Sequence, residues 1–241
     1  MAAMRALLFA LILTQATRPV DEFPTNAGPL NVTIIRHASL MIEAGGQVIH
    51  VDPSQGNYEG LPQADILLIT DTHGDHFVPP LIAKLRKPST VVVGPEAIAA
   101  KVEGVTVMKN GETKTIGKWV FEAVPMYNLK RGPAEGKVFH EKGRGNGYVI
   151  AYGGKRFYLA GDTEGIPEMR ALRNIDVAFI PMNLPYTMPP DEAAEAVRSF
   201  KPKVAYPYHY RGADLSVFVK ALASSGVEVR IRDWYYLGVV R

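Results

Sequence analysis

The order of short β-rich segments constrains the fold of this 241-residue chain more than any other feature. Runs such as Ser39 to Glu43 and Gln47 to Val51 are separated by turn residues, here Gly45-Gly46. In each half of the chain, a series of strands is followed by strands that alternate with helical patterns. This order predicts an α/β fold of the αββα type, in which two mixed β-sheets pack face to face with helices on the outside.

The expected elements extend over most of the chain. Strands are expected at 32–35, 39–43, 47–51, 66–69, 91–93, 105–108, 114–116, 119–126, 148–152, 156–160, 177–180, 204–208 and 234–239. Helices are expected after Pro79, after Pro95, near Ile166, from Asp191 and after a cap at Asp214.

The N-terminal residues have the pattern of a signal peptide. Arg5 precedes an apolar run from Ala6 to Leu13, and Thr14-Gln15-Ala16 resembles a cleavage site. The run is far shorter than the ~20 residues that span a bilayer, so no stable membrane insertion is expected after cleavage. We therefore expect a signal peptide at 1–16, a linker at 17–30, one domain at 31–241, and a periplasmic or secreted protein. A short N-terminal helix of a cytoplasmic protein is the alternative.

Composition excludes several classes of function. The formal charge is only +3 and no long run of Lys or Arg occurs, so no nucleic-acid partner is expected. The absence of cysteine excludes disulfides, thiolate metal ligands and a cysteine nucleophile. The expected partner is a small-molecule substrate, and the sequence leaves the oligomeric state open.

A cluster of metal-binding side chains follows the apolar run Ile66 to Ile69. Within six residues the chain has Asp71, His73, Asp75 and His76. Imidazole nitrogens together with carboxylate oxygens suit zinc, and also manganese or iron. A loop at a strand end allows such side chains to converge without disturbing strand pairing. Two solvated histidines in an acidic turn are the competing interpretation.

Three further positions have suitable ligands. Asp162 follows an expected strand, with Gly161 before it allowing a close backbone approach, and His209 follows another strand. His140 lies in the glycine-rich segment 128–147. Each alone is a weak indication, and their value comes from combination with the cluster at 71–76.

These ordered motifs resemble those of the metallo-β-lactamase-fold hydrolase superfamily over about 32–240. The family motif His-x-His-x-Asp-His corresponds to residues 71–76, its bridging aspartate to Asp162, and its last metal histidine to His209. The segments 36–40, 51–53 and 186–193 resemble the branch with the ascorbate-6-phosphate lactonases and the N-acylphosphatidylethanolamine phospholipase D enzymes. The resemblance implies a metallo-β-lactamase-like αββα sandwich and one or two Zn²⁺ ions, with Mn²⁺ or Fe²⁺ as alternatives.

The chain departs from the family pattern at one metal position. Asp71 stands where the motif begins with histidine, and Asn128 stands where a histidine usually follows the middle strand. Asp71, His73 and His140 are expected to rebuild this position, although a solvated loop residue is an equal reading of His140. The other position, implied by Asp75, His76, Asp162 and His209, is intact.

The resemblance also assigns roles. Asp75 is expected to be a metal ligand and the general base or proton shuttle. Asp162 is expected to bridge two ions, or to lie beside one ion if the first position is empty. His37 is expected to face the cleft as a second catalytic residue, with a hydrogen-bonding role in the core as the alternative. Asn128 and Tyr186 are expected to contact the substrate.

The expected function is metal-dependent hydrolysis by a metal-activated water. The bond is expected to be an ester, a lactone or a phosphodiester. The basic residues of segment 128–147 favour an anionic substrate if that segment covers the metals, whereas a solvated mobile loop is the alternative. A degenerate member of the fold that binds a metal or ligand without turnover is the alternative function, and iron-dependent oxidation is a third.

Overall fold

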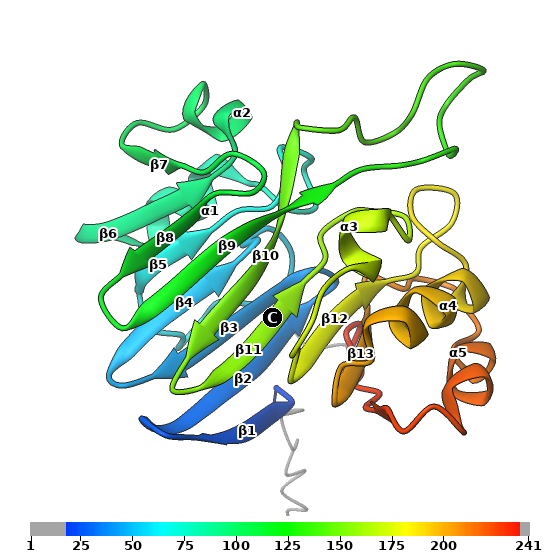
Figure 1. The fold of residues 1–241 in the computed structure, drawn as a ribbon. Coiled ribbons are helices and arrows are strands. Elements are labelled where there is room, and N and C mark those ends of the chain that lie inside the picture. Colours follow the sequence, from blue (N-terminus) through cyan, green and yellow to red (C-terminus); the bar gives the residue numbers. More distant parts are fainter. Residues whose placement is uncertain (1–17, 237–241) are drawn as a thin grey trace, which may run out of the picture.

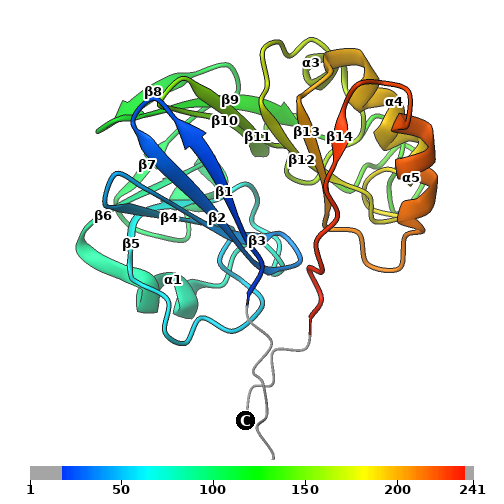
Figure 2. The same cartoon turned by 90° about the horizontal axis from the view of Figure 1, so that it is seen from below.

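A computed structural model describes residues 18–236, so the expected signal peptide lies outside the described residues. The chain forms two seven-stranded mixed sheets that face each other (Figures 1 and 2). The first sheet contains β1 (Val20–Thr25), β2 (Gly28–Arg36), β3 (Ser39–Ala44), β4 (Gln47–Val51), β5 (Ala64–Leu68), β6 (Arg86–Gly94) and β7 (Val105–Val107). The second contains β8 (Thr113–Ile116), β9 (Trp119–Met126), β10 (Gly145–Tyr152), β11 (Lys155–Leu159), β12 (Val177–Pro181), β13 (Val204–Tyr208) and β14 (Glu228–Val229).

Both sheets change from antiparallel to parallel pairing in the same way. Strands β1 to β4 pair antiparallel and β4 to β7 parallel, while β8 to β11 pair antiparallel and β11 to β14 parallel. Parallel neighbours need crossover connections, which here carry the helices. The helices are α1 (Pro79–Leu85), α2 (Glu96–Ala99), α3 (Pro167–Arg170), α4 (Pro190–Phe200) and α5 (Leu215–Leu222).

Three apolar layers hold this arrangement together. The largest lies between the sheets and includes Trp119, Phe179 and Trp234. A second packs α3, α4 and α5 on the second sheet, and a third packs α1 and α2 on the first. Helices therefore cover the outer face of each sheet, as Figure 2 shows. The predicted αββα sandwich is confirmed.

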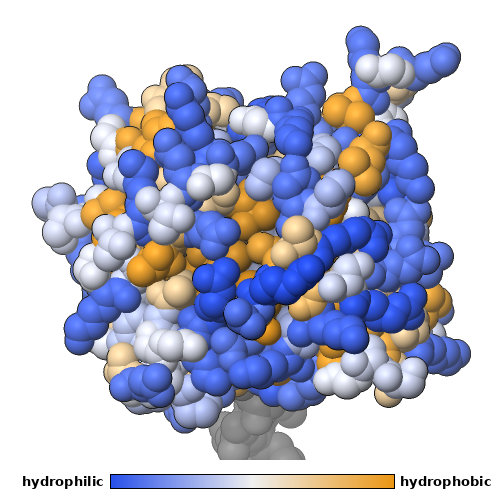
Figure 3. Space-filling model, viewed as in Figure 1, coloured by the Kyte–Doolittle hydropathy of each residue, from blue (hydrophilic) through white to orange (hydrophobic). Residues whose placement is uncertain are grey.

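The surface is predominantly polar. Hydrophilic side chains cover most of the face drawn in Figure 3, and apolar ones appear mainly in its recesses. Among residues 18–236, no helix has the length and apolar character needed to cross a membrane.

The expected linker at 17–30 is wrong, because β1 pairs with β2 over Val20–Thr25 and β2 begins at Gly28. The segment contains Pro24, but proline is tolerated on an edge strand, which β1 is. Phe23 is buried in the layer between the sheets, and Asp21 forms an ion pair with Arg232. This segment is part of the domain.

The expected strand at 234–239 is also wrong where it is described. Trp234 and Tyr235 form a turn, in which the side chain of Asp233 accepts a hydrogen bond from the backbone N–H of Tyr235 at 2.8 Å. Within the described part of this segment, Trp234 is fully buried and packs against Tyr208. The short strand β14 was missed.

We predict that Phe179→Ala lowers the free energy of unfolding by about 3–5 kcal/mol, because it opens a cavity between the sheets. Phe179 is fully buried, stacks on Tyr206 with ring centroids 4.9 Å apart, and contacts Trp234 edge to face. Equilibrium urea unfolding measures the loss. The exposed Val217→Ala in α5 is the control, with a change within about 0.5 kcal/mol. A similar small change for Phe179→Ala would contradict this packing.

Candidate metal centre

Both sheets contribute side chains to one end of the sandwich. The segment 70–76 follows β5 of the first sheet, while Asp162 follows β11 and His209 follows β13 of the second. Parallel strands bring their carboxyl ends to one edge of a sheet, so these segments meet. They lie around a cavity of about 690 Å³, whose lining includes His37, Asp75, Asp162 and His209.

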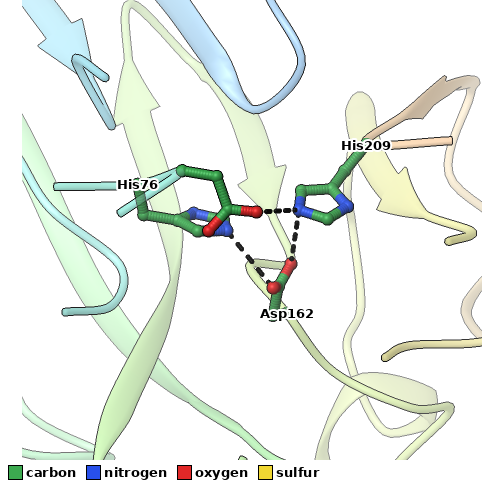
Figure 4. A group of neighbouring side chains, drawn as sticks. His76, Asp162 and His209 are labelled. Atoms are coloured by element: carbon green, nitrogen blue, oxygen red, sulfur yellow. Dashed lines mark hydrogen bonds and ion pairs between the residues drawn. The ribbon is translucent and has the colours of Figure 1, made fainter. Parts of the chain in front are cut away.

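The seven predicted metal ligands form two neighbouring groups. The four-residue group consists of Asp75, His76, Asp162 and His209, and the three-residue group of Asp71, His73 and His140. Within each group, one ligand atom per residue lies within 4.8 Å of the others. Figure 4 shows His76, Asp162 and His209 pointing toward one another. The structure thus brings all seven residues together, and their role as ligands stays a prediction.

The spacing within the four-residue group fits a metal ion. Nε2 of His76 lies 3.3 Å from Oδ2 of Asp162, and Nε2 of His209 lies 3.3 Å from Oδ1 of Asp162 and from Oδ2 of Asp75. Two ligand atoms that are each about 2.1 Å from one tetrahedral zinc ion lie roughly 3.4 Å apart. Within the described chain, the buried Nε2 of His76 and Oδ1 of Asp162 have no hydrogen-bond partner. Oδ1 of Asp162, and Nε2 of His76 once its ring gives up its proton to an incoming ion, therefore offer lone pairs to a cation.

The carboxylates of this group are held in the ionised form. Burial would raise the pKa of Asp162, but the charges of His209 and His76 lower it well below its usual value. Burial likewise opposes ionisation of Asp75, and hydrogen bonds from His209 and His37 lower its pKa below the usual value. Both side chains are thus negative at neutral pH, which a metal ligand requires.

Asp52 orients His76 from behind. Nδ1 of His76 donates a hydrogen bond to Oδ2 of Asp52 at 2.7 Å, which directs Nε2 toward Asp162. Thr70 fixes the carboxylate in turn, through its backbone N–H at 2.7 Å and its hydroxyl at 2.6 Å. Sequence reasoning noted the turn at 51–53 but missed this role. Such a carboxylate behind a ligating histidine is common in metal sites.

His140 is not a solvated loop residue. Its side chain is 2% exposed, and its Nε2 lies 3.3 Å from Oδ2 of Asp162. The side-chain oxygen of Asn128 accepts hydrogen bonds from Nδ1 of His140 at 2.7 Å and from its backbone N–H at 2.8 Å. With its proton on Nδ1, the ring directs the lone pair of Nε2 into the site.

Asn128 itself is not among the residues that line the cavity, and its contact with a substrate stays a prediction. It is buried, and besides holding His140 its amide donates to the backbone oxygen of Tyr186 at 2.8 Å. Tyr186 does line the cavity and is 46% exposed. Substrate contact by Tyr186 stays a prediction.

His37 both lines the cavity and forms hydrogen bonds in the structure, and its catalytic role stays a prediction. It lines the cavity, and its Nε2 lies 3.2 Å from Oδ2 of Asp75. Its Nδ1 lies 2.7 Å from the hydroxyl of Tyr235, and no sequence motif predicted this contact. Burial lowers the pKa of His37, so its ring favours the neutral form.

Ion pairs hold most of the basic side chains of segment 128–147. Lys130 and Arg131 pair with Glu192, and Lys142 pairs with Glu168. Arg144 reaches the site and pairs with Asp71. The segment therefore does not present a free positive surface to the cavity, whereas Arg211, outside it, lines the cavity.

Comparisons with known proteins give a consistent family. The sequence model of the beta-lactamase superfamily domain matches residues 31–209. A UPF0173 metal-dependent hydrolase of Thermus thermophilus is 31% identical over 217 residues, covering 83% of this chain and 94% of that protein.

Solved structures agree with this match. A protein of Parabacteroides distasonis, provisionally assigned as a metal-dependent hydrolase, has a TM-score of 0.86 at 42% identity, covering 90% of this chain and 99% of that one. Igni18, a metallo hydrolase of Ignicoccus hospitalis, has a TM-score of 0.70 at 23% identity over 84% of this chain and 94% of its own, which supports the fold alone.

We predict that Asp52→Asn weakens zinc binding about 10–100-fold, because an amide orients and polarises His76 less well than a carboxylate. Competition with a chromogenic chelator measures the affinity. Asp176→Asn is the matched control, since Asp176 is a buried carboxylate that pairs with Lys203 away from the cavity. Equal affinities for the two variants would contradict a role of Asp52 in the site.

We also predict that Zn²⁺ in excess, enough to occupy the three-residue group as well as the four-residue group, slows tryptic cleavage after the exposed Lys137, because an ion bound by His140 fixes the loop that contains both residues. His140→Ala should cancel this protection. Cleavage after the exposed Lys118, in the turn between β8 and β9, is the internal control and should not respond to the metal. Equal cleavage after Lys137 with and without Zn²⁺ would exclude His140 as a ligand.

Proposed function

The chain belongs to the beta-lactamase superfamily, and on this premise we propose that it is a metal-dependent hydrolase of ester, lactone or phosphodiester bonds in a small anionic molecule. The observation that carries the proposal is the spacing of about 3.3 Å among nitrogen and oxygen atoms of the four-residue group, at the cavity wall. We propose zinc as the native ion, since two imidazoles and two carboxylates suit it, with manganese or iron as alternatives.

The four-residue group would hold this ion. When bound, a divalent ion lowers the pKa of a coordinated water toward about 7 and polarises a carbonyl or phosphoryl oxygen. The chain's own residues supply the geometry: Asp52 and Thr70 fix His76, and the backbone N–H of His209 donates to the carbonyl oxygen of His37 at 3.1 Å. Ligands held in this way need little reorganisation when substrate binds.

Asp75 is the best placed proton acceptor. Its side chain is 33% exposed, lines the cavity and is ionised. His37 and His209 hold its Oδ2 at 3.2 and 3.3 Å, which fixes the direction of the carboxylate. We propose that Asp75 accepts the proton of the attacking water, and that His37, steadied by Tyr235, keeps it oriented.

Arg211 supports an anionic substrate. It lines the same cavity as His37 and His209, and its guanidinium lies over the ring of Tyr235, 5.8 Å from the ring centroid. Phe139, Leu184 and Tyr186 form an apolar part of the same wall. A small molecule with one anionic group and an apolar portion fits this lining.

The alternative of binding without turnover rests on Asp71 and Asn128, which stand where the family has histidines. Neither residue belongs to the four-residue group, which is complete and includes the ionised Asp75. The proposal therefore favours catalysis, on a metal held mainly by that group.

The test is a substrate panel with metal-loaded protein. We expect hydrolysis of a p-nitrophenyl ester, a lactone or bis(p-nitrophenyl) phosphate, loss of that activity with EDTA, and recovery with Zn²⁺ or Mn²⁺. His209→Ala should lose both the activity and the tightly bound ion. Arg211→Gln should raise KM about tenfold for the anionic substrate and leave a neutral ester unaffected. No turnover of any class by the loaded protein would contradict the proposed chemistry.

A further inference from the structure

We propose that the guanidinium of Arg144 takes the place of a metal ion in the three-residue group. The protein then binds one divalent ion tightly, and a second ion only when Arg144 leaves Asp71. This inference rests on the proposed function, because it takes the four-residue group as the tight site. It assigns to Arg144 a control of metal stoichiometry.

Arg144 lies where an ion of the three-residue group would have to be. Its guanidinium donates to Oδ2 of Asp71 at 2.6 Å and lies 3.2 Å from Nε2 of His73. Nδ1 of His73 in turn lies 3.0 Å from the same oxygen of Asp71. The carboxylate and the ring nitrogen that could face a metal therefore both face one guanidinium.

The charge balance differs between the two groups. The four-residue group has two carboxylates, Asp75 and Asp162, which together match one divalent ion. The three-residue group has one carboxylate, Asp71, and Arg144 already neutralises it. The side chain of Asp71 is fully buried, so little solvent screens the repulsion between Arg144 and an incoming ion. A second ion is thus opposed unless Arg144 moves.

The position of His140 also favours an ion in the four-residue group over one in the three-residue group. Its Nε2 lies 3.3 Å from Oδ2 of Asp162 but 3.9 Å from Oδ2 of Asp71. With Arg144 in place, His140 is closer to the carboxylate that the tight site uses than to that of its own group. Only the departure of Arg144 leaves Asp71 and His73 available to join His140 around a second ion.

Arg144 is held by one carboxylate, whereas Arg131 in the same loop is held by two. The side chain of Arg144 is 28% exposed, and its Nε has no hydrogen-bond partner within residues 18–236. Arg131, by contrast, is held by Glu164 and Glu192 together. Because the contacts of Arg144 with Asp71 and His73 involve one nitrogen at one end of the guanidinium, the side chain can rotate away from them while the loop backbone stays in place.

The experiment is a titration of metal-free protein with Zn²⁺ by calorimetry, with the stoichiometry checked by native mass spectrometry. We expect one tight ion for the natural protein, and for Arg144→Gln a second ion that binds at least about tenfold more tightly than in the natural protein. Lys142→Gln removes an equal charge from the same loop, where Lys142 pairs with Glu168, and should change nothing. Arg144→Lys keeps the charge and should still disfavour the second ion.

Two further variants make every outcome decisive. In Arg144→Gln, adding Asp71→Asn should abolish the second ion, whereas Asp71→Asn alone should keep one tight ion even if Arg144→Gln proves unstable. Two equally tight ions in the natural protein, an unchanged Arg144→Gln, or loss of the tight ion in Asp71→Asn would overturn the role of Arg144. The absence of any tight ion in the natural protein, or a tight ion that survives His209→Ala, would instead overturn the proposed function.

Discussion

The carboxylate of Asp162 is approached by three imidazoles, and the rest of the site is arranged around it. His76 comes from the end of a strand in the first sheet, His209 from the second, and His140 from the loop between β9 and β10, each with Nε2 3.3 Å from a carboxylate oxygen. A buried carboxylate is costly unless positive charge or hydrogen bonds compensate it. Because its imidazole neighbours lie 3.3 Å away and its Oδ1 has no hydrogen bond within residues 18–236, a bound cation is the natural compensation. At this end of the sandwich, side chains from both sheets and from the loop therefore meet at one carboxylate.

The backbone around this cluster is held in an unusual conformation. His37, Asp52 and His209 have φ values of 57°, 43° and 48°, in the left-handed region that favours glycine. Such conformations cost about 1–3 kcal/mol each and persist where the surrounding structure fixes them. Here the fixing contacts are backbone hydrogen bonds, from His209 to His37 and from His37 to Trp234, both at 3.1 Å. The buried turn at Trp234 therefore supports the ends of β2 and β13 from the C-terminal side.

The strand ends could be predicted from sequence because they depend on local patterns. Apolar runs bounded by Gly, Pro and Asp locate β5, β11 and β13, and the predicted metal ligands lie in the residues that follow these strands. Side-chain contacts between residues that are far apart in the sequence could not be predicted, because they depend on how the loops fold. Nothing local indicates that Tyr235 meets His37, or that a basic loop directs Arg144 to Asp71. Edge strand β1 was missed because its pairing, and not its composition, makes it a strand.

Asn128 stands where the family has a histidine, and a histidine from another part of the chain, His140, is held beside it. The family resemblance leads one to expect an imidazole at this strand end, and here an amide stands there and binds an imidazole twelve residues later. Glu164, two residues beyond Asp162, accepts hydrogen bonds from three consecutive backbone N–H groups, those of residues 129–131. Because Glu164 is buried, it fixes the start of the loop relative to Asp162 itself. The position of His140 is therefore set by the same segment that supplies the central carboxylate, so that the loop and the metal centre form one unit.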